Sequence, residues 1–180
     1  SYKEMLLLLR LVPPLLFAVA HAAVQEAWGN WASGKAIIKP GFFQGAAVHG
    51  RFDDSIETTG WGTLELQTLP GALAPALDDA QVQYVLGYME GYLTAGRIAK
   101  HLANGMASAQ PSAAVMEYFR DQGDWLNKQV LSNRRVDPYW RHVEYMLQRL
   151  LGMSHAQSDR AMVAGGALEI DWASWLLMQA

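Results

Sequence analysis

Acid–base side chains are present in this sequence, but none of them forms a recognised catalytic pattern. Glu90 and His101 are eleven residues apart in a helical stretch, a spacing of about three turns that puts both on one side of a helix. A histidine favoured by the helix dipole and a solvated glutamate would explain the same pair. His142 stands alone in another helical stretch, with no neighbour to orient it as a base. The spacing offers candidates for proton transfer without establishing a catalytic pair.

Glu57 and Glu65 lie on either side of Trp61, so both carboxylates could face one cleft. Alternatively, one of them is buried and hydrogen-bonded while the other is exposed. The chain has no cysteine, which removes disulfides, zinc–thiolate sites and any thiol nucleophile from it. The sequence also contains no HExxH zinc motif, no Walker phosphate loop and no GxSxG motif. We therefore expect no metal and no cofactor.

The composition fits one domain with a sizeable core. The chain has 180 residues and a mass of 19.9 kDa, with 51% hydrophobic residues and a mean hydropathy of +0.00, which excludes wholesale disorder and a multi-span membrane protein. Only 17% of the residues are charged, so much apolar surface must pack inward or against a partner. The net charge is -3 and no basic stripe occurs. A nucleic-acid partner is therefore not expected.

Residues 1–22 have the features of a secretory signal peptide. Lys3 precedes an apolar run over residues 5–20, and Ala20-His21-Ala22 supplies the small-x-small pattern that signal peptidase recognises. An arginine and two prolines interrupt the run, and they argue against a membrane-spanning helix. A membrane anchor and a core element are the alternatives. We expect the mature domain to comprise residues 23–180.

The elements that must position the candidate side chains change in type along the chain. Residues 23–68 contain short aromatic and β-branched runs cut by glycines, which is typical of strands. Within them we predict a hairpin with arms over residues 24–28 and 35–39. Over residues 61–68, Leu64 and Leu66 alternate with polar residues, which predicts a strand with both leucines on one face.

Apolar residues then recur at helical spacing. The pattern predicts helices over residues 79–102, 112–131 and 138–152, with Asn104-Gly105 ending the first and Gly152 ending the third. Residues 154–166 resemble a loop, and residues 168–178 predict one more strand. The fold class is therefore α+β, with strands first, then three helices and a final strand.

Two glycines inside the first helix need an explanation. Gly87 and Gly91 are four residues apart, and each costs about 1 kcal/mol relative to alanine in a helix. Close backbone packing against a neighbour would offset this cost, whereas the charged residues nearby make a membrane GxxxG dimer a poor alternative. The sequence also has seven tryptophans, rings that mostly build cores and buried interfaces and that can also bind sugars.

Three ordered motifs resemble the phospholipase B-like family, the group that includes the lamina ancestor proteins and the lysosomal phospholipase B-like proteins. The first motif covers residues 54–68 and includes Glu57, Thr58, Gly60, Trp61 and Glu65. The second covers residues 87–94 and the positions that follow, and includes Gly87, Glu90, Gly91, Ile98, His101 and Asn104. The third includes Trp125, Pro138, Tyr139 and Trp140, with an amphipathic helix after them. The resemblance spans residues 24–180.

The resemblance implies the N-terminal part of an N-terminal-nucleophile hydrolase, an αββα sandwich made as a precursor that cuts itself into two associated chains. The first residue of the second chain would be a cysteine whose thiol attacks an ester or amide carbonyl, with its own α-amine as base. In the family that cysteine lies C-terminal to everything in this sequence, so we expect no catalytic residue here. Glu57, Thr58, Gly60 and Trp61 are expected to be packing and hydrogen-bond anchors beneath the site. Trp61→Ala is then expected to open a buried cavity, at about 3 to 5 kcal/mol, and to stop processing.

Two functional classes remain open from the sequence. The first is the N-terminal chain of a phospholipase B-like hydrolase that cleaves acyl ester or amide bonds of lipids. Its partner would be the C-terminal chain of the same precursor, and it would be extracellular or lysosomal. The second is a non-catalytic secreted interaction module, or a lipid- or sugar-binding module. A Cys, Ser or Thr at the cut would keep catalysis possible, and any other residue would remove it. Formation of a homodimer is also left open.

Overall fold

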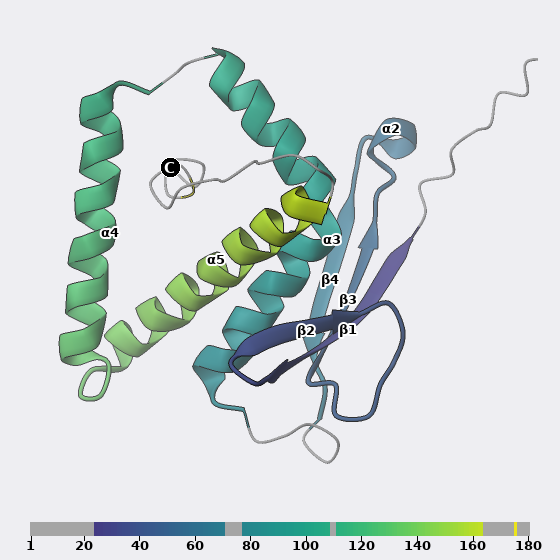
Figure 1. Cartoon of the computed structure of the whole chain (residues 1–180), viewed down its shortest axis with the longest axis horizontal. Helices are drawn as coiled ribbons and strands as arrows, with labels where there is room; N and C mark the ends of the chain where they lie inside the picture. Colours follow the sequence, from purple (N-terminus) through teal and green to yellow (C-terminus); the bar gives the residue numbers. More distant parts are fainter. Residues whose placement is uncertain (1–23, 71–76, 109–110, 164–174, 176–180) are drawn as a thin grey trace, which may run out of the picture.

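The described residues form an α+β fold around one antiparallel sheet (Figure 1). The computed structural model describes residues 24–70, 77–108, 111–163 and 175. The strands are β1 (Gln25–Ala32), β2 (Lys35–Lys39), β3 (Val48–Asp53) and β4 (Thr63–Thr68), and the helices are α2 (Ile56–Thr59), α3 (Asp79–Ser108), α4 (Ala113–Asn133) and α5 (Pro138–Val163). The strand order is β2-β1-β3-β4. The predicted α+β class, with strands before three long helices, is confirmed for these residues.

Strands β1 and β2 form the predicted hairpin, with a tighter turn than expected. Strand β1 continues to Ala32, which pairs with Lys35, so only Ser33 and Gly34 lie between the strands. Both have positive φ, 53° and 78°, the backbone conformation that two-residue hairpin turns favour. The predicted first arm, ending at residue 28, is therefore too short.

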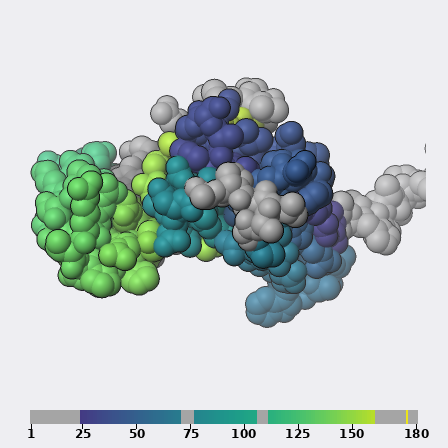
Figure 2. Space-filling model, turned by 90° about the horizontal axis from the view of Figure 1, so that it is seen from below, coloured from purple at the N-terminus to yellow at the C-terminus, as the bar shows by residue number. Residues whose placement is uncertain are grey.

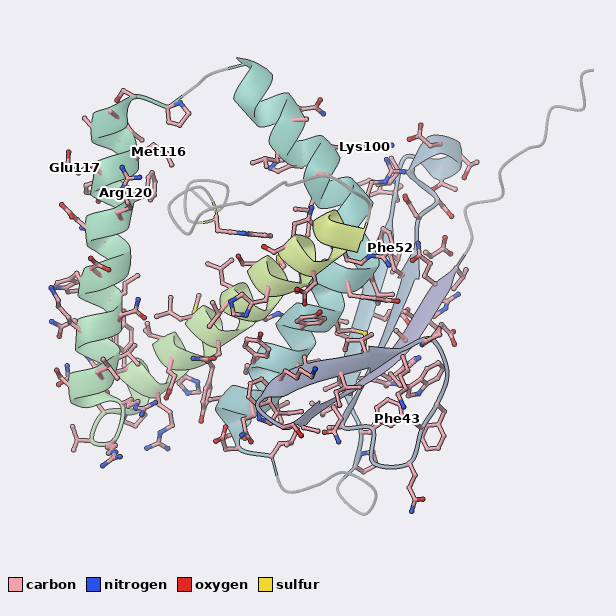
Figure 3. The ribbon with its side chains drawn as sticks, in the orientation of Figure 1. Phe43, Phe52, Lys100, Met116, Glu117 and Arg120 are labelled. Carbon is pink, nitrogen blue, oxygen red and sulfur yellow. The ribbon has the colours of Figure 1, made fainter. Side chains whose placement is uncertain are left out.

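One face of the sheet builds the core against α3. Ala27 of β1 and Val48 and Phe52 of β3 are buried on this face, and Figure 3 shows Phe52 between the sheet and α3. Leu64 and Leu66 of β4 pack against the same cluster, which confirms that they share one face. The side chains that α3 contributes are Val85, Leu86, Met89 and Leu93.

Helix α3 crosses α5 at unusually short range. A Cβ on Gly87 would lie 1.9 Å from the carbonyl oxygen of Arg149, and a Cβ on Gly152 would lie 2.1 Å from that of Tyr84. A Cβ on Gly91 would lie 2.6 Å from the carbonyl oxygen of Met153. No side chain fits at such distances, so glycine is required at the crossing. The predicted close backbone packing at Gly87 and Gly91 is confirmed.

Two helices run past the glycines predicted to end them. Helix α3 continues through Asn104-Gly105 to Ser108, and α5 continues through Gly152 to Val163. Residues 154–163, predicted as a loop, are therefore helical. A glycine ends a helix when it adopts the left-handed conformation after the last turn. Gly152 instead lies inside α5 and leaves space for the backbone of α3, so this glycine is explained by helix packing and not by the end of a helix.

Helix α4 packs on α5 and stands at one end of the molecule, away from the sheet (Figures 1 and 2). It begins where predicted, after Ser112, whose hydroxyl accepts a hydrogen bond from the Val115 amide at 3.3 Å. This side-chain cap satisfies one of the free amides of the first turn. Among the helices of the described ranges, none is long and apolar enough to cross a membrane.

Two sequence predictions fall outside the described residues. These are the signal peptide over residues 1–22 and the final strand over residues 168–178, in which only Trp175 is described. The Trp175 side chain is 1% exposed. The second sheet of an αββα sandwich is not present within the described ranges, which contain a single four-stranded sheet.

Replacing Gly152 with alanine should destabilise the fold, because the new methyl would lie 2.1 Å from the Tyr84 carbonyl oxygen. Overpacking of this kind costs about 1–3 kcal/mol, occasionally more. The matched control is Gly96→Ala, in the partner helix α3, where an added Cβ meets nothing within 4 Å. Alanine should stabilise that helix by up to about 1 kcal/mol. Urea unfolding of the full-length protein measures both, and equal midpoints would contradict the close crossing.

Candidate functional site

The first motif forms the short turn α2 between β3 and β4. The carbonyl oxygen of Ser55 accepts hydrogen bonds from the hydroxyls of Thr58 and Thr59, each at 3.0 Å. Gly60 ends the turn with φ of 81°, and its amide donates to the Ile56 carbonyl at 2.9 Å. This left-handed conformation favours glycine over any residue with a side chain. Thr58 and Gly60 therefore shape the backbone of the motif.

Arg97 of α3 holds this turn against the helix. Its Nε lies 2.9 Å from each carboxylate oxygen of Asp54, and its Nη1 donates to Glu57 at 3.2 Å. The hydrogen bond to Asp54 is the main reason that the pKa of Arg97 is raised; desolvation opposes it and Glu57 adds to it. Charge-assisted contacts to both carboxylates fix the direction of the guanidinium. Figure 3 shows this end of α3 beside α2, with Lys100 labelled.

Three residues of the first motif are more exposed than predicted. Trp61 is 78% exposed, so the prediction of a buried ring, with a large loss of stability in Trp61→Ala, is wrong for the described fold. The side chains of Glu57 and Glu65 are 76% and 65% exposed, so neither is a buried carboxylate. Glu65 faces Arg51 at 4.0 Å. The motif presents these groups outward because α2 protrudes from the sheet, as Figure 2 shows.

The second motif lies at the crossing of α3 and α5. Between the glycines, Glu90 accepts hydrogen bonds from Nε and Nη2 of Arg149 at 3.1 and 2.9 Å. The Glu90 side chain is only 24% exposed, so the interpretation of a solvated glutamate is wrong. His101 is exposed and lies within α3, not at its end. Glu90 and His101 do not form an acid–base pair, because eleven residues of one helix separate them by about 16 Å along the axis; Arg149 is the partner of Glu90 instead.

The third motif lies where α5 begins, at the opposite side of the molecule from α2 (Figure 1). Tyr139 is 64% exposed, and its ring meets that of Trp140 edge-on with centroids 5.1 Å apart. Trp140 also meets Trp125 of α4 at 5.8 Å. This aromatic cluster joins α4 to α5, so the three motifs do not converge on one site within the described residues.

A polar cluster that the sequence analysis missed lies beside the second motif. The Tyr84 hydroxyl is 2.6 Å from Nδ1 of His155, and the Tyr88 hydroxyl donates to Asp159 at 2.5 Å. Together with Lys35, these residues line a cavity of about 310 Å³. Tyr84 and Tyr88 are four residues apart on α3, and His155 and Asp159 are four residues apart on α5, the spacing of neighbours on one helix face. The sequence shows this spacing, but it does not show that the two helix faces are in contact.

Burial raises the pKa of both tyrosines in this cluster. For Tyr84 the next cause is the negative charge of Asp159, and for Tyr88 it is the hydrogen bond to Asp159. Because a raised pKa favours the neutral phenol, both hydroxyls stay protonated at physiological pH. The cavity therefore presents two neutral phenols that are already paired with His155 and Asp159, beside the Lys35 ammonium, and neither phenol is activated as a nucleophile.

The described residues position groups without assembling a reaction centre. Within the described ranges, no group of three or more His, Asp or Glu could hold a metal ion. The Ser158 hydroxyl donates to the Ser154 carbonyl at 3.1 Å, and not to His155, so it lacks the base that activates a serine nucleophile. Arg97 and Glu90 use their charges to hold neighbouring elements in fixed positions, and neither is placed to react with a substrate.

Alkaline titration should distinguish Tyr88 from an exposed tyrosine. Folding raises its pKa above the ordinary value of 10.0, so the stabilisation is complete below about pH 10 and is lost as the pH rises through the folded pKa. Tyr88→Phe should flatten the alkaline fall in stability and remove a late-ionising phenol from the absorbance titration. Tyr118→Phe, at a 58% exposed position, is the control. It should leave both the alkaline fall in stability and the late-ionising phenol in place. An unchanged profile in Tyr88→Phe would contradict the bond to Asp159.

Comparison with known proteins agrees with the three motifs. Residues 48–180 match the phospholipase B family. Phospholipase B-like 1 of Rattus norvegicus is 34% identical over 118 residues, which cover 63% of this chain and 21% of that protein. Phospholipase B of Crotalus adamanteus is 29% identical over 147 residues, 77% of this chain and 26% of that protein. Phospholipase B-like 1 of Bos taurus is 27% identical over 167 residues, 89% of this chain and 29% of that protein.

The chain spans less than a third of the length of each of these relatives. The matched region runs from the start of β3 through α5 and so includes α2, the crossing of α3 with α5, and the aromatic cluster. The resemblance inferred from the motifs is confirmed. The chain belongs to the phospholipase B family.

Proposed function

We propose that this chain is the N-terminal part of a phospholipase B-like hydrolase that cleaves acyl ester or amide bonds of lipids. Its nucleophile would lie on a C-terminal chain of the same precursor. The observation that carries the proposal is the family match over residues 48–180 in a sequence without cysteine. The names of the relatives support phospholipids as the substrate class. The signal-like residues 1–22 support an extracellular or lysosomal location.

The proposed reaction is that of an N-terminal nucleophile. The thiol sulfur of the first residue of the C-terminal chain bonds to the acyl carbon, and its proton passes to the α-amine of the same residue. The leaving alcohol or amine takes that proton as its bond to the acyl carbon breaks. Water then hydrolyses the thioester, which releases the fatty acid and restores the thiol. The chain described here would supply the scaffold on which the C-terminal chain is held.

The outer face of the sheet supports a second layer supplied by the rest of the precursor. Trp28 and His49 lie there with ring centroids 4.6 Å apart. The Nδ1 of His49 lies 3.0 Å from the Gln67 amide nitrogen, whereas its buried Nε2 has no hydrogen-bond partner among the described residues and lies 4.0 Å from the Glu26 carboxylate. No described helix packs extensively on this face, whereas α3 covers the other. A second sheet on the outer face would complete an αββα sandwich and could supply a hydrogen-bond partner for the Nε2 of His49.

The competing function is a non-catalytic binding module, and the exposure of Trp61 is the observation that favours it. An aromatic ring that is 78% exposed is a typical contact for a lipid, a sugar or another protein. The residue at the cut decides between the two functions, because only Cys, Ser or Thr can serve as an N-terminal nucleophile.

Expression of the full-length protein should yield two chains that copurify, the second beginning with cysteine. Replacing that cysteine with alanine should abolish both self-cleavage and release of fatty acid, because the attacking sulfur is lost. Intact mass and N-terminal sequencing follow the cleavage, and phosphatidylcholine and an N-acyl amide serve as substrates. A second chain that begins with neither Cys, Ser nor Thr would overturn the proposal. Undiminished hydrolysis by the alanine variant would do the same.

The exposed ring of Trp61 should contribute to the association of the two chains. Trp61→Ala should release the N-terminal chain at a lower urea concentration than the unsubstituted protein, since exposed tryptophans are frequent anchors of interfaces. Phe42→Ala removes another exposed ring, 61% accessible and outside the first motif, and should change little. Gel filtration at increasing urea measures the dissociation. If the N-terminal chain dissociates at the same urea concentration in Trp61→Ala and Phe42→Ala, Trp61 has no role in assembly.

A further inference from the structure

The turn between α4 and α5 concentrates positive charge in a protein of negative net charge. Residues 128–142, the hairpin tip, contain four cations and one aspartate, whereas the whole chain has a net charge of -3. The four cations are Lys128, Arg134, Arg135 and Arg141. Arg134 pairs with Glu144. Among the described residues, Arg135 and Arg141 have no ion-pair partner, and both side chains are exposed.

Large apolar side chains stand beside these cations. Leu131 is 71% exposed, Val136 is 81% exposed and Tyr139 is 64% exposed. Single exposed apolar residues are normal on a protein surface, but a group of three next to unpaired arginines is the composition of an interfacial segment. A tyrosine ring in such a position prefers the boundary between water and lipid, because it has an apolar body and a polar end.

The backbone holds the hairpin tip in one conformation. The amides of Val136 and Asp137 both donate to the carbonyl of Asn133, at 3.0 and 2.9 Å. The Asp137 carboxylate then accepts from the Tyr139 amide at 2.9 Å, at the start of α5. The side chains are therefore presented by a formed turn, which lowers the entropy cost of binding.

A hollow of about 410 Å³ lies between the hairpin tip and the start of α3. Three arginines, Arg134, Arg135 and Arg141, line it together with three carboxylates, each of which accepts a hydrogen bond or pairs with a cation. Asp78 accepts from the Gln81 amide, Asp79 accepts from the Tyr145 hydroxyl, and Glu144 pairs with Arg134. Asp78 and Asp79 keep their charge because their donors are neutral, so the side of the tip that faces away from the start of α3 is where Arg135 and Arg141 can meet a phosphate group.

From this juxtaposition we propose that the hairpin tip binds the surface of an anionic phospholipid bilayer. The arginines would contact phosphate and carboxylate headgroups, and Leu131, Val136 and Tyr139 would enter the headgroup boundary. Within the described part of the chain, the tip lies at the extremity away from the sheet (Figure 1). The inference rests on the proposed function only for the choice of phospholipid as partner, and it adds membrane attachment to bond cleavage.

Flotation of the full-length protein with ether-linked vesicles tests binding separately from hydrolysis, because ether lipids have no acyl ester to cleave. We expect binding to vesicles that contain phosphatidylserine, little binding to phosphatidylcholine alone, and weaker binding as potassium chloride increases. The double variant Arg135→Gln/Arg141→Gln should bind about thirty-fold more weakly, since each basic side chain near an anionic surface contributes about five-fold. Val136→Asn should also weaken binding, and because Val136 is 81% exposed, the substitution should leave the fold unchanged.

The control variants Lys100→Gln and Phe42→Asn remove a cation and an apolar ring elsewhere on the surface, and both should bind like the unsubstituted protein. Unchanged binding by the double arginine variant, or equal binding to neutral vesicles, would overturn the inference. Dimerisation that is lost in the same variants, without any vesicle binding, would assign the tip to a second copy. Hydrolysis of a dispersed short-chain substrate separates the two proposals: its absence with intact vesicle binding removes the proposed function and leaves this inference standing.

Discussion

The close crossing of α3 and α5 is the constraint on which the rest of the described structure depends. Gly87 and Gly152 each face a backbone carbonyl of the other helix at a distance that excludes any side chain. This contact sets the position of α5, and the Glu90–Arg149 ion pair and the hydrogen bonds of Tyr84 and Tyr88 form beside it. The opposite side of α3 carries Met89 and its neighbours into the sheet. One helix therefore organises both layers.

The described motif residues act mainly through position. Arg97 joins α2 to α3, Glu90 joins α3 to α5, and Trp140 joins α5 to α4. The first two contacts connect residues 43 and 59 positions apart in the sequence, the third joins consecutive helices, and none places a nucleophile beside a base. This pattern is the one expected if the reacting group lies on another segment, as proposed above.

The sequence predicted most of the secondary structure, because those elements depend on nearby residues. The alternation of Leu64 and Leu66 gave the face of β4, and Ser112 marked the start of α4 through its own side-chain cap. The helix ends were predicted less well. Gly105 and Gly152 have the local signature of a stop, yet both lie inside helices. Whether a glycine ends a helix or admits a neighbour depends on what packs there, which a local pattern does not record.

The sequence by itself therefore determined the family, the α+β class and the chemistry that this chain lacks, because motif order, periodicity and the absence of cysteine are properties of the chain. Only the tertiary structure decided which side chains meet and which face solvent. Glu90 gained a partner 59 positions away in Arg149, Tyr84 gained one 71 positions away in His155, and Trp61 was left exposed. The physical reason is that burial and pairing are set by contacts between elements, and these follow from how α3 packs on α5 and on the sheet.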